Sequence, residues 1–120
     1  MTFQRKQLGR KGEEVAAQYL INKGYALLCR NFTCNIGEID LVALDREALV
    51  FVEVRSRSGT EYGLAQESIT KRKQHKLRQL AWYYLQVERK TENCCRFDVI
   101  AVSFNEEGIL ISLDHIINAF

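Results

Sequence analysis

Residues 37–57 read GEIDLVALDREALVFVEVRSR, and this stretch decides the fold. Apolar runs at 36–44 and 48–56 are rich in the Val, Leu, Ile and Phe residues that are typical of strands. The four residues 45–48 join them, which is an allowed length for a hairpin loop. Both runs also contain charged residues, which a sheet buries only at a cost in stability.

The register of this hairpin decides where its carboxylates lie. If Leu44 faces Leu49, then Asp40 lies directly opposite Glu53. Cross-strand partners share one face of a sheet, with Cβ atoms about 4.5–5.5 Å apart. The two carboxylates are therefore expected to meet on one face, unless a slip of one residue separates them.

Two carboxylates opposed in this way repel each other. One could keep its proton, both could turn into water, or a divalent cation could lie between them. Mg²⁺ binds through one or two carboxylates, waters and substrate phosphates, an arrangement that suits phosphodiester hydrolysis. The structural alternative stays open: the same register places Glu38 opposite Arg55 as an ion pair, with Asp40 and Glu53 on a solvent-exposed face.

The rest of the chain predicts a single domain over residues 1–120 of the α/β (α+β) class. We expect a mixed sheet of about five strands flanked by helices, in the order α-β-β-β-α-β-β-α. Gly24 should end the first helix, and 59–63 should form a glycine-bounded loop. The expected elements are a helix over 8–23, strands over 25–32, 36–44 and 48–56, a helix over about 68–89, strands over 96–104 and 108–112, and a helix over 115–120.

Composition excludes several classes of protein. Hydrophobic residues make up 47% of the chain and charged residues 27%, which are average values for a globular protein. No apolar run approaches the roughly 18 residues of a membrane span, and the N-terminus lacks the apolar core of a signal peptide. We therefore expect a cytoplasmic protein without membrane contact. The four cysteines lack C-x-x-C spacing, so free thiols are expected rather than a zinc site.

Basic residues are concentrated rather than abundant. The net charge is only +2, but residues 71–78, KRKQHKLR, contain five Lys or Arg and one His. Such a run is either a solvated helix face or a surface that contacts phosphates.

Four motifs are close to those of a known family: GEIDLVA (37–43), FVEVR (51–55), KQHKL (73–77) and CRFDVIAV (95–102). Together they resemble the YraN-like family, which is grouped with restriction endonucleases and Holliday-junction resolvases in the PD-(D/E)XK nuclease-like superfamily. The resemblance runs from about Gly9 to Val102. It implies a restriction-endonuclease-like core and a Mg²⁺- or Mn²⁺-dependent DNA endonuclease, with selectivity for branched or flapped DNA as a further expectation.

The resemblance also implies site residues. Asp40 and Glu53 match the acidic motif residues, as catalytic groups and metal ligands, and Glu13 matches a metal-binding glutamate of the first helix. A charge near a helix N-terminus is the structural alternative for Glu13, and Glu14 lies one step around the helix. Arg55 stands where the superfamily has lysine. Because guanidinium stays charged, Arg55 is expected to stabilise the attacked phosphate rather than to remove a proton, which leaves the activation of water to the metal.

We also assign expected roles to Lys73, to Asp98 and to the basic residues. Lys73 could supply the ammonium that Arg55 replaces. Asp98 lies in a motif that resembles one of the family, and we expect a structural carboxylate bonded to Arg96 or to a neighbouring turn rather than a metal ligand. The residues expected to contact the DNA backbone are Lys71, Arg72, Lys73, His75, Lys76 and Arg57.

Two other functions remain alternatives to the nuclease. A DNA-binding adaptor with the nuclease fold and little or no activity would explain the missing motif lysine. An interaction module would use the aromatic residues 82–84. A nuclease that cuts two strands would suit a homodimer, although the sequence has no heptad repeat that would indicate one.

Overall fold

A computed structural model describes residues 5–58, 69–90 and 92–120, in which five strands form one mixed sheet between two helices. The elements are α1 (Arg5–Asn22), β1 (Ala26–Cys34), β2 (Gly37–Asp45), β3 (Ala48–Ser58), α2 (Lys71–Val87), β4 (Cys94–Phe104) and β5 (Leu110–Ile116). The strands lie in the order β1-β2-β3-β4-β5; β3 and β4 pair in parallel, and the other neighbours are antiparallel. The chain makes the crossover that a parallel pair requires through the segment containing α2.

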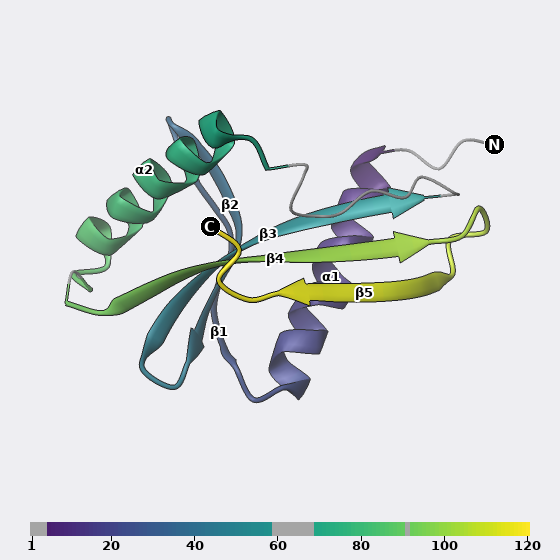
Figure 1. Cartoon of the computed structure of the whole chain (residues 1–120), viewed down its shortest axis with the longest axis horizontal. Helices are drawn as coiled ribbons and strands as arrows, with labels where there is room; N and C mark the ends of the chain where they lie inside the picture. The colour runs from purple at the N-terminus through teal and green to yellow at the C-terminus, as the bar shows by residue number, and fades with distance from the viewer. Residues whose placement is uncertain (1–4, 59–68, 91) are drawn as a thin grey trace.

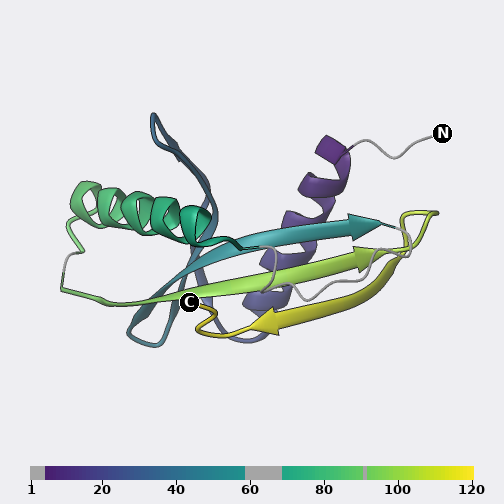
Figure 2. The ribbon, with the colours of Figure 1, turned by 45° about the horizontal axis from the view of Figure 1, so that its top comes forward.

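The two helices pack on opposite faces of the sheet (Figures 1 and 2). On β3, Val50 and Val52 belong to the core under α1. Leu49 and Phe51, which alternate with them, belong to the core under α2. This alternation buries both faces of β3, which explains its nearly continuous apolar sequence. Neither described helix is long and apolar enough to cross a membrane.

The predicted fold class and hairpin register are confirmed. Leu44 pairs with Leu49, and Gly24, with φ of 95°, follows the end of α1. The second helix begins three residues later than expected, at Lys71, where the Thr70 side chain accepts a hydrogen bond from the Lys73 amide. The expected loop over 59–63 lies outside the described residues. All four cysteines are free thiols.

The predicted terminal helix over 115–120 is wrong, so the observed order is α-β-β-β-α-β-β. Strand β5 continues to Ile116, which pairs with Val99. Asn118 then adopts a left-handed conformation with φ of 55°. Six residues are too few for a stable isolated helix, whereas pairing with β4 satisfies the backbone groups. The strand expected at 108–112 is accordingly shifted toward the C-terminus.

Gly12 allows α1 to lie directly against β3. A Cβ atom at this position would lie 1.7 Å from Ser56 Oγ and 3.0 Å from Ser56 Cβ. Within the described part of the chain, Ser56 Oγ is buried without a hydrogen-bond partner. Because Glu13 is the next residue of α1, this close contact also determines where the Glu13 carboxylate lies.

Gly12→Ala is expected to lower the free energy of unfolding by about 1–3 kcal/mol, because the added methyl group overlaps Ser56. Gly9→Ala is the matched control in the same helix. Nothing lies within 4 Å of that position, so this substitution should raise stability by about 0.5–1 kcal/mol. Urea unfolding followed by circular dichroism measures both changes. Similar shifts for the two variants would show that α1 does not need glycine at Gly12.

Candidate active site

The hairpin carboxylates lie where β2 and β3 part. The ladder between these strands ends at the pair Leu41–Val52, and Figure 1 shows the strands diverging beyond it. Asp40 and Glu53 are the next residues on the two strands, and their side chains interact. The Val54 amide donates to Asp40 Oδ2 at 2.8 Å. The two carboxylates therefore lie side by side, as predicted, at the point where β2 and β3 separate.

Three carboxylates from two elements converge at this opening. One oxygen each of Glu13 on α1 and of Glu38 and Asp40 on β2 lie within 4.8 Å of one another. The sequence pointed to Glu13 and Asp40 but placed Glu38 opposite Arg55. The β2–β3 ladder ends before that pair could form, and Glu38 pairs with Thr33 on β1 instead. We call Glu13, Glu38 and Asp40 the carboxylate cluster.

The turn of α1 distinguishes Glu13 from its neighbour Glu14. Glu13 is half-buried and joins the carboxylate cluster. Glu14 is exposed and forms an ion pair with Arg30, whose Nη2 lies 2.6 Å from Glu14 Oε2. Of these two residues, the geometry therefore favours Glu13 as the contribution of α1 to the site.

Glu53 is a fourth carboxylate beside the cluster, and it faces two cations. Its side chain is only 6% exposed. Arg55 Nη1 and Lys73 Nζ each lie 3.4 Å from Glu53 Oε2. Arg55 comes from the same strand, whereas Lys73 reaches the site from α2. The structure thus brings the motif arginine and the expected substitute ammonium to the same carboxylate.

Burial and neighbouring charges raise the pKa of two carboxyls in the carboxylate cluster. Burial, and then the charge of Glu53, raise the pKa of Asp40 to about 8. Burial and the charge of Glu38 also raise the pKa of Glu13, while a hydrogen bond from Asn31 acts in the opposite direction. Without a cation, Asp40 therefore keeps a proton near neutral pH that an isolated aspartate would release.

Asn31 is a residue of the site that the sequence reasoning missed. With its amide nitrogen turned toward the cluster, it donates to Glu13 Oε1 at 2.9 Å and to Glu38 Oε1 at 3.1 Å. Its φ of 56° lies in the left-handed region. An asparagine inside an apparent strand is the signal that could have marked this position, because asparagine tolerates that conformation better than most residues.

A cavity of about 280 Å³ lies between the carboxylates and α2. Two of the six residues expected to bind DNA, Lys73 and Lys76, line it. The other four lie elsewhere: Lys71, Arg72 and His75 are exposed on α2, and Arg57 is half-buried on β3. The complete lining consists of Glu38, Asp40, Glu53, Val54, Lys73, Lys76, Leu77 and Leu80.

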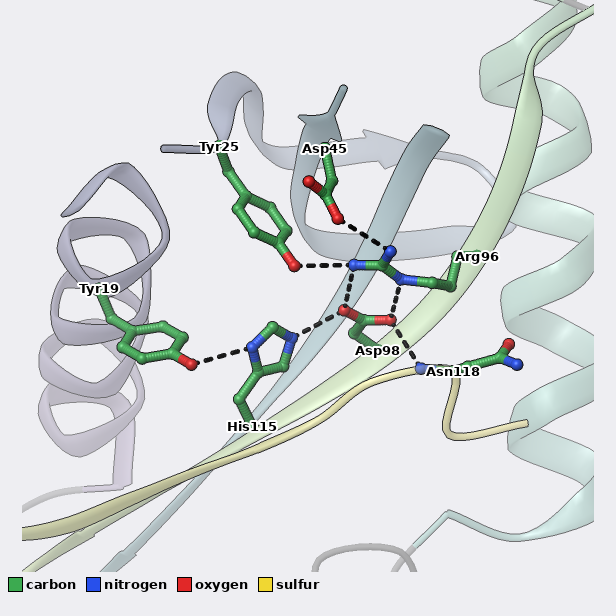
Figure 3. A network of polar contacts seen from close by, with 7 residues as sticks. All are labelled: Tyr19, Tyr25, Asp45, Arg96, Asp98, His115 and Asn118. Atoms are coloured by element: carbon green, nitrogen blue, oxygen red, sulfur yellow. Dashed lines mark hydrogen bonds and ion pairs between the residues drawn. The ribbon is translucent and has the colours of Figure 1, made fainter. Parts of the chain in front are cut away.

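A second buried carboxylate, Asp98, belongs to a separate network on β4 (Figure 3). Arg96 donates to its two oxygens at 2.9 and 3.1 Å, and His115 Nε2 donates at 2.7 Å. The Asn118 amide donates at 3.0 Å. Burial acts to raise the pKa of Asp98, but the bonds from His115 and Arg96 outweigh it and hold this pKa below its ordinary value. The predicted bond between Asp98 and Arg96 is confirmed.

Comparison with known proteins gives family relatives whose names state no activity. The model of UPF0102, described as an uncharacterised protein family, matches residues 12–102. A UPF0102 protein of Pelotomaculum thermopropionicum is 59% identical over 120 residues, which is 100% of both chains. Another, of Desulforamulus reducens, is 50% identical over 121 residues and 99% of each chain. A third, of Caldanaerobacter subterraneus subsp. tengcongensis, is 43% identical over 97% of this chain and 96% of the relative.

Proposed function

The chain belongs to the UPF0102 family of YraN-like proteins, and from its site we propose that it is a Mg²⁺- or Mn²⁺-dependent DNA endonuclease. In this proposal it is a cytoplasmic member of the PD-(D/E)XK nuclease-like superfamily and hydrolyses phosphodiester bonds in branched or flapped DNA. One observation carries the proposal. Four carboxylates from α1, β2 and β3 gather beside two cationic side chains where the sheet opens.

The donor set fits a hard divalent cation. Carboxylate oxygens are the ligands that Mg²⁺ and Mn²⁺ prefer. One oxygen each of Glu13, Glu38 and Asp40 lie within 4.8 Å of one another, and the side chain of Glu53 interacts with that of Asp40. Repulsion among these carboxylates contributes to the raised pKa of Asp40. A bound cation would reduce this repulsion.

Each side chain of the site has a role in this proposal. Glu13, Asp40 and Glu53 would hold the metal, with Glu38 as a further oxygen donor. A bound ion supplies Lewis-acid polarisation of a phosphoryl oxygen and makes water more acidic. Arg55 cannot take a proton from water, so it would neutralise the charge that develops on the phosphate.

Lys73 and the basic face of α2 would position the DNA. Lys73 lies next to Glu53 and lines the cavity, so it would act on the attacked phosphate together with the arginine of β3. Lys76 lines the same cavity and would hold an adjacent phosphate. The exposed residues Lys71, Arg72 and His75 would extend this contact along the backbone, which positions a duplex without reading its sequence.

Lys73→Ala tests this proposal in a Mn²⁺-supported cleavage assay on labelled flapped and four-way branched DNA. We expect the maximal cleavage rate to fall about 100-fold, because a charge that stabilises the transition state is removed. Lys71→Ala, two residues away and exposed, is the matched control. It should weaken DNA binding in a salt-dependent way and leave the rate at saturating DNA unchanged.

The metal requirement is checked in the same series with Glu53→Gln and by paramagnetic resonance of bound Mn²⁺. Loss of cleavage in Glu53→Gln, with DNA binding retained, would support a metal-dependent nuclease. Salt-sensitive DNA binding that needs no metal and leads to no cleavage would instead support an adaptor with the nuclease fold. Failure to bind either metal or DNA would leave the interaction module.

A further inference from the structure

Asn31 has an unusual position for a residue in a strand. It lies within β1, with a left-handed φ of 56°. Cys29 and Phe32, three residues apart, both pack into the core under α2. In a regular strand residues three apart point to opposite faces, so the chain departs from regular alternation around Asn31.

The Asn31 amide joins two carboxylates that come from different elements. With the amide turned so that its nitrogen faces the carboxylate cluster, this nitrogen lies 2.9 Å from Glu13 Oε1 and 3.1 Å from Glu38 Oε1. An amide carries two N–H donors, one for each glutamate. The opposite orientation would place the amide oxygen against two carboxylates, which can only accept hydrogen bonds when ionised. The donor orientation is therefore the one that the surroundings require.

We propose that Asn31 is a positioning residue of the metal site, which holds Glu13 and Glu38 together so that their oxygens are preset for a divalent cation. This inference rests on the metal binding in the proposed function, but not on cleavage of DNA. A lysine could also bridge two glutamates, but its charge would compete with the metal ion, whereas an amide adds no net charge. Removal of such outer-shell partners typically weakens metal affinity about 10- to 100-fold.

Asn31→Gly is the direct test, because glycine accepts the left-handed backbone and removes the amide. Mn²⁺ titration by calorimetry should show about 10-fold weaker binding than in wild type, with unchanged stoichiometry. Asn118→Gly is the matched control: Asn118 has φ of 55° and an exposed side chain. This control should bind Mn²⁺ as wild type does.

A double-mutant cycle separates positioning from general loosening of β1. In a Glu38→Gln background, Asn31→Gly should lose most of its effect on Mn²⁺ affinity, because one of the two charges that the amide holds is already absent. The same loss in both backgrounds, or wild-type affinity in Asn31→Gly, would overturn the positioning role and leave the nuclease proposal standing. Failure of the wild type to bind Mn²⁺ would overturn both.

Discussion

Asp40→Asn is expected to abolish saturable Mn²⁺ binding and, in the metal-free protein, to raise the free energy of unfolding by about 2 kcal/mol at pH 8. Asparagine keeps the shape of aspartate and can still accept the hydrogen bond of the Val54 amide, which is 2.8 Å long in the wild type. It removes one charge from a cluster of repelling carboxylates, and its amide can donate to Glu53. A substitution that removes the proposed function should therefore stabilise the empty fold.

The pH dependence of this effect follows from the pKa of Asp40. Burial, and then the charge of Glu53, raise that pKa to about 8, whereas an aspartate in an unfolded chain titrates near 3.9. Between the two values the folded state binds more protons than the unfolded state, so wild-type stability falls as pH rises from about 4 to about 8. The shift sets an upper limit of about 6 kcal/mol. Because the buried asparagine still carries the cost of burying a polar group, the expected gain is smaller than this limit.

Urea unfolding at pH 5 and pH 8, with chelator and with Mn²⁺, measures both parts of this prediction. Saturating Mn²⁺ should raise the Tm of the wild type, because it binds only the folded state, and should leave the Tm of Asp40→Asn unchanged. Asp114→Asn, at an exposed carboxylate of β5, is the control and should change neither quantity. A metal-free Asp40→Asn that is less stable than wild type at pH 8 would make Asp40 a structural carboxylate.

Local sequence patterns were sufficient for the hairpin and for part of the site. The spacing of apolar residues defines β2 and β3, and the length of their loop fixes the register in which Leu44 faces Leu49. That register brings Asp40 and Glu53 to the same place. Arg55 comes two residues after Glu53 on β3, so its side chain is expected on the same face of the strand. The contacts among Asp40, Glu53 and Arg55 could therefore be predicted without knowledge of the rest of the fold.

The remaining site residues depend on contacts that no local pattern contains. Glu38 joins the carboxylate cluster because β2 leaves β3 beyond Leu41, and an ideal hairpin drawn from sequence does not diverge. Asn31 reaches the cluster through a left-handed conformation inside β1. Glu13 reaches the carboxylate cluster because Gly12 allows α1 to lie directly against β3. The C-terminal segment was predicted wrongly for the same reason: its pairing with β4 is a long-range contact.

Asp98→Ala is expected to be the most destabilising of these substitutions and to lower the free energy of unfolding by about 3–5 kcal/mol. The carboxylate is fully buried and accepts hydrogen bonds from Arg96, His115 and the Asn118 amide (Figure 3). Its removal leaves a charged guanidinium with fewer partners and takes the acceptor from two further donors. Among the described residues, Tyr25 and Asp45 are the other groups that accept hydrogen bonds from the guanidinium of Arg96.

The contribution of Asp98 to stability depends on pH with the opposite sign from that of Asp40. Since hydrogen bonds outweigh burial and hold the pKa of Asp98 below its ordinary value, its contribution to stability is present above about pH 4 and is lost as pH falls through the folded-state pKa. Urea unfolding should therefore give a constant difference between wild type and Asp98→Ala near neutral pH and a smaller one in acid. Tyr25→Phe, which loses one bond to Arg96, should cost about 0.5–1.5 kcal/mol without that acid dependence.

Metal affinity separates the structural role of Asp98 from a role in the site. Asp98 lies outside the carboxylate cluster and is paired with Arg96 and His115. The folded fraction of Asp98→Ala should consequently bind Mn²⁺ with wild-type affinity, whereas Asp40→Asn should bind none. A stable Asp98→Ala with weakened Mn²⁺ binding would reverse the assignment and place Asp98 in the site. Removal of the two buried charges should thus have opposite effects on stability. Without the charge of Asp40 the protein should lose metal binding and become more stable, whereas without the charge of Asp98 it should lose only stability.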